Sequence, residues 1–483
     1  MNKHDSALQT YQYALRVLNP GCTGYQQIKE LAAKLDRRLN GPKLTDPFTV
    51  LPLELVSLIL EYLDLASLLS AVRVSKHWSV LLNSFPKLWS HLDLSKARRR
   101  AVSLKSIQAF LRRSRWGLTR ATLVNIRPDD YPKLMTGLNQ IRSLEHLELH
   151  GSFKTGFEVA PVYTLTRLKT LICSELSAMS VLHFGRILSE CLLLERAEVH
   201  LQSAPLAEYQ SFPARLPHLR SLTIVESGDV RNRAVVSPLS LPFIGDATLF
   251  DITPNLEELY LIHKTSPEMN GMPEISNLPN LKRLGLLGTI LNSFPALPES
   301  LERLSLSKSL HNPRAVQPLT TANLSDMAPN LKTLILHQFR ASEIGTFLIT
   351  FTQNKPSLTH LDLEGCHLPV EDLLITMMHG NLENVTSLNI SGLAEIDDRV
   401  MANIIDMMPN IKQLDISRAQ VKEHSAKRLI SSDNLKLERL VVHKMETPFS
   451  REFLDYAKSK GVEIPPPIHH NGVVSAPSFE PRR

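Results

Sequence analysis

Histidine and cysteine are the side chains best suited to chemistry, but here they do not follow any spacing that catalysis or metal binding requires. The chain holds 18 His and four Cys among 483 residues. The adjacent pair His469-His470 has no Cys or acidic residue nearby, so it does not predict a metal site. No G-x-x-x-x-G-K-[ST] or G-x-G-x-x-G phosphate loop, H-E-x-x-H helix or G-x-S-x-G elbow occurs. The sequence therefore predicts a non-enzymatic protein without a metal or cofactor.

The cysteines Cys22, Cys173, Cys191 and Cys366 are scattered without C-x-x-C spacing. This pattern predicts reduced thiols in a cytosolic or nuclear protein. The last three lie at or beside apolar segments, and we interpret them as small core residues rather than nucleophiles. No run of about 18 apolar residues occurs, and the N-terminus MNKHDSALQ lacks an apolar signal core, so we expect neither a membrane span nor secretion.

Binding through an apolar surface is the function that remains, and residues 51–89 carry many apolar side chains suited to it. One apolar stripe at helical spacing is formed by Leu55, Leu58, Ile59, Tyr62 and Leu63. Pro52 is suited to begin this helix, and Asp64 and Ser75 are suited to cap two more. Three short helices bury only part of this apolar surface among themselves, so we expect a partner. The alternative is a three-helix subdomain that docks on its own chain.

This stretch resembles the F-box. The positions that match the family's motif are Leu51, Pro52, Leu55, Ile59, Leu63, Leu68, Val74, Trp78 and Trp89. The resemblance implies that the helices bind a Skp-type adaptor, which bridges to a cullin in SCF ubiquitin ligases. Some of these residues would contact the adaptor and others would hold the helices together, and the sequence does not separate the two groups.

A repeated frame, L-x-x-L-x-L, fills the chain after the F-box-like stretch. It is clear at residues 144–149, 219–224, 256–261, 281–286, 301–306, 331–336 and 358–363, and recurs at 89–94, 118–123, 168–173, 194–199, 385–390, 411–416 and 437–442. Spacings of mostly 24–27 residues are the period of leucine-rich repeats. Helix-like segments such as 181–190, 370–378 and 399–408 separate the frames. The fold class predicted is therefore α/β, with a curved solenoid whose parallel sheet lines the concave side.

In a strand, the residues between the inward-facing leucines point to the opposite face of the sheet. At the centre of the array these residues include Tyr260, Ile262, Arg283, Leu287, Arg303 and Ile335. An apolar centre ringed by Arg and acidic residues is typical of a protein-recognition surface, so we predict that a protein substrate binds there. The alternative is that the concave face of any solenoid carries such a mixture.

The predicted organisation has five parts. Residues 1–40 form a helical hairpin, 41–48 a linker, 49–95 the F-box, 96–460 the solenoid and 461–483 a disordered tail. The hairpin resembles a remnant of a tetratricopeptide repeat, because Ala7, Tyr11 and Ala14 precede Pro20. Either it packs on the F-box or the sequence begins inside a longer protein. The surplus residues 226–246 predict a loop that leaves the solenoid.

The charge is concentrated in one region. The net charge is +6, and residues 96–142 hold twelve Lys and Arg against two Asp. A nuclear import signal or a patch that meets DNA or an acidic partner is one interpretation. The alternative is a solvated helix face, since the region has no known nucleic-acid motif.

An F-box followed directly by leucine-rich repeats resembles the substrate receptors of SCF ubiquitin ligases. The hairpin and the junction after Trp89 look most like the fungal tetratricopeptide–F-box–leucine-rich-repeat proteins, which implies a nuclear location. We therefore expect a non-catalytic receptor whose F-box binds the adaptor and whose solenoid binds the protein to be ubiquitinated. The alternatives are a scaffold that binds the adaptor without causing degradation, and a chromatin-tethered binding protein that uses residues 96–142.

Overall fold

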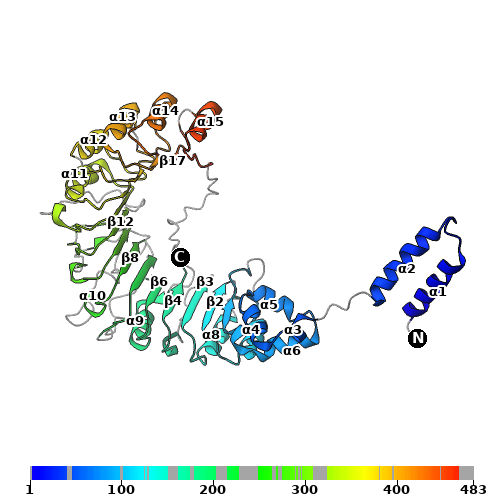
Figure 1. The fold of residues 1–483 in the computed structure, drawn as a ribbon. Coiled ribbons are helices and arrows are strands. Elements are labelled where there is room, and N and C mark those ends of the chain that lie inside the picture. Colours follow the sequence, from blue (N-terminus) through cyan, green and yellow to red (C-terminus); the bar gives the residue numbers. More distant parts are fainter. Residues whose placement is uncertain are drawn as a thin grey trace. The chain divides into compact units, whose positions relative to one another are not determined.

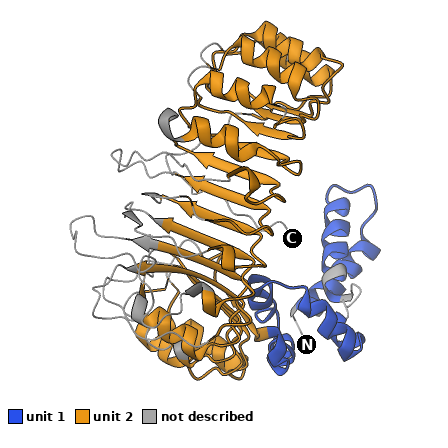
Figure 2. Cartoon of the chain, turned by 90° about the vertical axis from the view of Figure 1, so that its left-hand side faces the viewer, with its two compact units in different colours: residues 1–88 blue, residues 89–483 orange. Residues whose placement is uncertain are grey.

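The structure is a computed structural model of residues 1–483. It describes residues 3–40, 46–97, 102–124, 126–127, 130–150, 162–174, 179–202, 215–227, 249–263, 268–269, 275–288, 290–291, 294, 296–307, 324–379, 381–393, 396–445 and 448–466. The chain divides into two compact units, residues 1–88 and residues 89–483 (Figure 2). Within the described ranges, no helix combines the length and the apolar composition that crossing a membrane requires.

Where the structure describes it, the first unit contains helices and no strand. Its elements are α1(Lys3–Val17), α2(Tyr25–Asn40), α3(Pro47–Val50), α4(Leu53–Glu61), α5(Leu65–Ala71), α6(Lys76–Ser84) and, at its end, the 3₁₀ helix η1(Pro86–Trp89). Helices α1 and α2 pack together as the predicted hairpin, and Leu8 and Ala32 are buried. Its relation to tetratricopeptide repeats stays a prediction.

Capping side chains define the short helices of the first unit. As expected, Asp64 accepts a hydrogen bond from the Ser67 amide at the start of α5, and Ser75 accepts one from the Trp78 amide at the start of α6. Asp46 does the same for α3, which begins at Pro47. The predicted linker over 41–48 is therefore too long, because its last two residues already form the first turn of α3; residues 41–45 lie outside the described part of the chain.

The second unit is built on one parallel sheet of 15 strands. Fourteen strands follow one another in chain order: β1(His91–Asp93), β2(Arg120–Val124), β3(His146–His150), β4(Thr170–Cys173), β6(Arg196–Gln202), β7(Ser221–Ser227), β8(Glu258–His263), β10(Arg283–Leu287), β12(Arg303–Ser307), β13(Thr333–His337), β14(His360–Asp362), β15(Ser387–Asn389), β16(Gln413–Asp415) and β17(Arg439–Val441). The short β5(Met179–Ser180) pairs with β6. Every L-x-x-L-x-L frame contains a strand of this sheet, which confirms the predicted leucine-rich-repeat solenoid.

Helices cover the outer side of this sheet (Figure 1). They are α7(Leu104–Arg113), α8(Tyr131–Leu138), α9(Val181–Glu190), α10(Leu249–Ile252), α11(Ala341–Thr352), α12(Val370–Met378), α13(Asp398–Met407), α14(Glu423–Ser431) and α15(Arg451–Ser459), with short 3₁₀ helices at Val162–Thr164, Ile275–Asn277 and Leu324–Asp326. Two further strands, β9(Glu268–Met269) and β11(Ile290–Leu291), pair with each other. The sheet lines the concave side of the second unit, as predicted.

Strand register places like residues side by side. Leu284 of β10 lies between Leu259 of β8 and Leu304 of β12, and all three are fully buried. The non-leucine positions of the same strands line up on the concave face. The expected core is therefore confirmed, since stacking the repeats buries a continuous line of leucines.

Asparagines that precede the frames add a second connection between repeats. The amide Nδ2 of Asn330 donates to the carbonyl of Glu299 at 3.0 Å, and that of Asn410 donates to the carbonyl of Glu383 at 3.1 Å. Asn255, Asn280 and Asn384 make equivalent bonds. Each bond pairs a loop carbonyl that the sheet itself does not reach.

A line of alternating charge follows the first leucine of eight of the frames. In eight successive strands this position is occupied by Glu145, Lys169, Glu195, Arg220, Glu257, Lys282, Glu302 and Lys332. Ion pairs join neighbours, with N–O distances of 2.9 Å for Lys169–Glu145 and Lys282–Glu257 and 3.0 Å for Lys332–Glu302. We call these eight residues the charge ladder.

The last strand does not end the sheet. Glu463 pairs with Arg439 of β17, and the Leu440 amide donates to the Glu463 carbonyl at 2.9 Å. The disordered tail predicted from residue 461 therefore starts too early, because Val462 is buried and its neighbours extend the backbone ladder. Residues 467–483, and most of the predicted loop 226–246, lie outside the described residues.

Candidate functional site

Helix α4 shows large apolar side chains to solvent. Leu55, Leu58 and Ile59 are 47%, 54% and 45% exposed, and Tyr62 just after the helix is 91% exposed. Val56 and Leu60 face inward and are fully buried. Leu55, Leu58 and Ile59 of the apolar stripe therefore lie on the outward face, while the inward face uses two other positions four residues apart.

Burial sorts the nine residues that match the F-box motif. Pro52, Leu55, Ile59 and Val74 are exposed; Leu51, Leu63 and Trp78 are half-buried; Leu68 and Trp89 are buried. The exposed group is free to meet a partner, whereas Leu68 and Trp89 contribute to the interior. Binding of an adaptor by the exposed group stays a prediction.

Trp78 fixes the short helix α3 against α6. Its indole Nε1–H donates to the carboxylate of Asp46, with 2.9 Å to each oxygen, and its ring lies 4.1 Å from that of Phe48. Asp46 thus caps α3 and holds Trp78 at the same time. Trp78 therefore positions the start of the F-box-like helices.

Trp89 belongs to the interior of the second unit. It is fully buried, and its ring meets Phe110 of α7 edge-on, with centroids 5.6 Å apart. The guanidinium of Arg113 lies 5.2 Å from the centre of the Trp89 ring, a cation–π contact. Trp89 is therefore part of the first repeat, and its predicted contact with an adaptor would require this packing to open.

The concave face carries paired charges on its N-terminal strands β3 and β6. Glu148 lies 3.4 Å from Nε2 of His150, and Glu198 lies 3.6 Å from the guanidinium of Arg196. In the pair Glu148–His150, the hydrogen bond between the two side chains lowers the pKa of the Glu148 carboxyl and raises the pKa of His150. These groups are largely satisfied within the chain.

The centre of the concave face contains all six residues predicted to bind a substrate. Register places Ile262 beside Leu287, and Arg283 beside Arg303. Arg283 forms an ion pair with Glu258, whose carboxylate also accepts a hydrogen bond from Ser221 at 3.0 Å. The structure thus brings the predicted residues together on neighbouring strands, and their role in binding stays a prediction.

Tyr260 lies flat on this face because Gly285 makes room for it. A Cβ atom added to Gly285 would lie 2.2 Å from Cδ1 of Tyr260, so the ring covers the glycine of the next strand. Tyr260 is only 8% exposed, and burial raises the pKa of its hydroxyl. Sequence reasoning named Tyr260 but missed Gly285, whose place at a concave position of its frame was the available clue.

Two polar atoms of β12 are buried at this centre without partners. Nε of Arg303 and Oγ of Ser305 have no hydrogen bond among the residues that the structure describes, and Ser305 is only 3% exposed. Buried polar groups are usually paired, so these two need an explanation. Ser305 was not predicted as a site residue.

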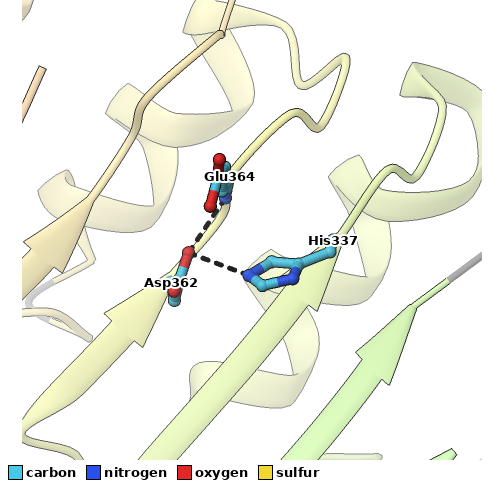
Figure 3. Close-up of side chains that lie close together, drawn as sticks. All are labelled: His337, Asp362 and Glu364. Atoms are coloured by element: carbon cyan, nitrogen blue, oxygen red, sulfur yellow. Dashed lines mark hydrogen bonds and ion pairs between the residues drawn. The ribbon is translucent and has the colours of Figure 1, made fainter. Parts of the chain in front are cut away.

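His337, Asp362 and Glu364 form the cluster best able to hold a metal ion within the described ranges (Figure 3). They offer one nitrogen and two carboxylates whose ligand atoms all lie within 4.8 Å of one another. Nε2 of His337 is 3.1 Å from Oδ1 of Asp362, which also accepts a hydrogen bond from the Glu364 amide. Burial opposes protonation of His337, but the Asp362 and Glu364 carboxylates outweigh it and raise the pKa. The residues come from adjacent repeats, so no short motif could reveal them.

The cysteines are placed as the sequence suggested. Cys173, Cys191 and Cys366 are buried, and burial raises the pKa of each thiol to about 12. The Cys366 thiol donates to the Leu336 carbonyl at 3.0 Å. Thiols in this state are poor nucleophiles, which supports their interpretation as core residues.

Comparisons with known proteins agree with the first unit's helices. Residues 48–95 match the F-box-like family model. No curated protein sequence matches the chain. The similar solved structures include a TLR13–ssRNA13 complex (16% identity, 72% of this chain and 56% of that chain, TM-score 0.36), Listeria monocytogenes InlP (15%, 47% and 56%, 0.24) and PEPR1–AtPEP1 (16%, 73% and 50%, 0.35).

The chain spans about half the length of the solved chains that it matches. At these identities and TM-scores the matches add nothing to the geometry of the sheet. The assignment of the second unit as a leucine-rich-repeat solenoid rests on its own frames, strand order and register. An F-box-like domain and a solenoid of this kind are both typical of non-catalytic interaction proteins.

Proposed function

We propose that this chain, an F-box-like domain followed by a leucine-rich-repeat solenoid, is the substrate receptor of an SCF-type ubiquitin ligase. The observation that carries the proposal is the apolar face of α4, where Leu55 and Ile59 are exposed within the F-box-like match. Exposed apolar groups of this size are typical of a protein interface. A Skp-type adaptor is the occupant that the F-box-like match implies, with a cullin bound through it.

The solenoid would supply the second half of this function. Its concave centre combines Ile262 and Leu287 with two arginines, which suits recognition of a protein. Holding a substrate near a ubiquitin-charged enzyme accelerates transfer by proximity, so the receptor needs no catalytic group of its own. A nuclear location follows only from the resemblance to the fungal proteins.

The adaptor proposal is tested with the double substitution Leu55→Ala and Ile59→Ala. We expect it to abolish co-purification with a Skp-type adaptor while the thermal unfolding of the chain changes little. A matched control is Leu192→Ala with Leu193→Ala, because these leucines of the second unit are 48% and 41% exposed. Adaptor binding that persists in the Leu55/Ile59 variant would overturn the proposal.

The substrate proposal is tested with Arg283→Glu and Arg303→Glu in one chain. We expect loss of a specific captured protein with the adaptor retained, whereas Arg439→Glu, at the same level on β17, retains both. If the captured protein's lifetime does not change when the receptor is deleted, the protein acts instead as a non-degradative scaffold.

A second candidate function, binding of DNA or chromatin, is favoured by one observation. Arg115 and Trp116 are exposed in a left-handed turn after α7, with Arg112 also exposed nearby. An aromatic ring beside cations suits contact with nucleic acid. Affinity for DNA that falls steeply with salt and drops on Arg112→Gln with Arg115→Gln would support it, and salt-insensitive binding would exclude it.

A further inference from the structure

The helix α3 is one turn long, and none of its four side chains is buried. A single turn is not stable as an isolated helix, because nucleation fixes several backbone dihedrals for one hydrogen bond. Burial in an apolar core does not hold α3 in place either. Its conformation therefore depends on the contacts at its start and on its half-covered side chains.

Asp46 makes two kinds of contact at the start of α3. Its Oδ1 accepts a hydrogen bond from the Phe48 amide at 3.0 Å and a second one from the indole Nε1 of Trp78 at 2.9 Å. The bond from the indole N–H to a carboxylate is charge-assisted, which makes it stronger than a neutral one. The Phe48 ring lies 4.1 Å from the Trp78 ring. Asp46 and Phe48 together therefore fix α3 to α6.

Large apolar side chains are exposed where α3 meets α4. Val50, the last residue of α3, is 66% exposed, and Leu53, the first residue of α4, is 56% exposed. Leu55 of the proposed adaptor-binding face follows two residues later and is 47% exposed. Residues 47–60 contain one charged side chain, Glu54. An exposed apolar surface with so little charge suits an apolar surface of a protein partner.

We infer that α3 is part of the adaptor-binding surface and that Asp46 is the residue that positions it, so that Val50 is presented together with Leu55. This inference rests on the proposed function and adds one helix and one positioning residue to the same surface. Asp46 lies outside residues 48–95, which match the F-box-like family model. The indole N–H of Trp78 is bonded to Asp46, so Trp78 acts on the adaptor through the position of α3.

The adaptor is the partner that fits this surface, because Val50 and Leu53 continue the exposed apolar face of α4 along the chain. The position of α3 affects affinity because a surface that is ordered before binding loses less conformational entropy on association. Without the bonds to Asp46, the turn of α3 would have to be ordered when the adaptor binds. The two bonds therefore act as preorganisation of the binding surface.

Contact between α3 and the adaptor is tested with Val50→Ser in the full chain, titrated calorimetrically with a purified Skp-type adaptor. We expect the Kd to rise at least about fivefold, because a valine that is buried on binding is replaced by a polar group. Val17→Ser on α1 is the matched control, since Val17 is also 66% exposed, and it is expected to leave the Kd unchanged. Equal Kd values for the two variants would exclude α3 from the adaptor-binding surface.

The positioning role is tested with Asp46→Ala and Asp46→Asn. Alanine removes both bonds, whereas asparagine keeps an oxygen that can accept from the Phe48 amide and from the Trp78 indole. We expect Asp46→Ala to raise the Kd about tenfold and Asp46→Asn to raise it less than about threefold. Equal losses in the two variants would show an effect of the negative charge alone and contradict the positioning role. An unchanged Kd in Asp46→Ala would contradict it as well.

A double-mutant cycle tests whether Asp46 and Trp78 act through the same bond. Trp78→Phe keeps an aromatic ring but removes the N–H. We expect the chain with Asp46→Ala and Trp78→Phe to bind the adaptor no more weakly than the weaker of the two single variants. Circular dichroism and thermal unfolding confirm that each variant is folded. Additive losses of affinity would show that the two residues act independently, and would overturn the proposed positioning of α3.

Failure of this inference is distinguishable from failure of the proposed function. Adaptor binding that is lost with Leu55→Ala and Ile59→Ala but keeps its original Kd in Val50→Ser and Asp46→Ala would support the proposed function and overturn the inference. A chain without substitutions that does not bind the adaptor would overturn both.

Discussion

In the F-box-like helices large apolar side chains face outward, whereas the leucines of the frames in the solenoid are packed inside. Leu55 and Leu58 of α4 are about half exposed, while Leu284 and Leu304 of the sheet are fully buried. The concave face of the solenoid instead mixes Arg and Glu with the apolar Ile262 and Leu287. The same residue type therefore forms an exposed apolar face in one unit and the core of the other, and composition alone does not separate these positions.

This difference has a consequence for selectivity. An apolar face binds one complementary partner with little dependence on charge or pH, which suits a constant subunit. A face of paired and unpaired charges discriminates among ligands, because each unmatched charge is penalised on desolvation. The division fits a protein that keeps one partner and selects another.

The sharpest test of the comparison uses two leucines of α4. Leu60→Ala is expected to lower the free energy of unfolding by about 2–5 kcal/mol, because its side chain is fully buried. Leu58→Ala, at a side chain 54% exposed, is expected to change it by less than about 0.5 kcal/mol while weakening adaptor binding. Urea denaturation and calorimetric titration measure the two effects. If Leu58→Ala destabilises the chain as much as Leu60→Ala, Leu58 is buried in solution, and the contrast between an exposed apolar face of α4 and a buried core of the solenoid is wrong.

A glycine tests the packing of the concave face. Gly285→Ala places a methyl group 2.2 Å from the Tyr260 ring, so we expect a loss of about 1–3 kcal/mol from overpacking. The same change in a Tyr260→Ala background is expected to be close to neutral. Thermal unfolding of the four chains of this double-mutant cycle measures the coupling. Additive effects would show that the ring does not lie on Gly285.

The asparagine bonds between repeats predict a smaller effect. Asn330→Ala leaves the Glu299 carbonyl without its partner, so we expect a loss of about 1 kcal/mol. Asn403→Ala is the control, because Asn403 bonds only to Arg399 of its own helix, and it is expected to change stability by less than about 0.5 kcal/mol. The urea midpoints of the two variants are compared. Equal midpoints would show that the bond between repeats does not stabilise the chain.

The smallest expected effect is a dependence of stability on pH, which we expect for the charged face of the solenoid and not for the apolar face of α4. Asp362 and Glu364 raise the pKa of His337 against the opposing effect of burial, so the protonated pair stabilises the solenoid. This contribution is fully present below the ordinary histidine pKa of about 6.5 and is lost as pH rises through the raised value. Asp362→Asn is expected to lower the His337 pKa, as followed by NMR of the imidazole. A pKa that does not change in Asp362→Asn would show that the ion pair is absent in solution.

The sequence predicted the fold well where one physical rule decided the outcome. Period-two leucines, mostly at a spacing of 24–27 residues, predicted each of the fourteen strands, and Asp64 and Ser75 predicted two helix starts through their capping side chains. The sequence left open which apolar residues of α4 face inward, because Leu55, Leu58 and Ile59 follow the same helical spacing as a core stripe, and only packing shows that Val56 and Leu60 face inward.

The candidate site was harder to predict because its contacts join residues that are distant in sequence. Arg303, Gly285 and Tyr260 come from three strands, and Gly285 matters because the Tyr260 ring covers it. His337 and Asp362 are likewise brought together only by register. The frame predicted which positions share the face, whereas the pairing of charges and the unsatisfied atoms of β12 depend on rotamers that no frame encodes.

The charge ladder has a consequence for how the repeats find their order. Every repeat offers nearly the same leucine frame, so a folding chain could stack one repeat on its second neighbour instead of its first. Because the sign alternates, such a skip would place Glu145 on Glu195 or Lys282 on Lys332, and like charges would meet along the whole misaligned edge. Each pair in the native order contributes less than about 1 kcal/mol. Their alternating sign nevertheless favours the native order of neighbouring repeats over a skipped order, which a uniform line of leucines does not do.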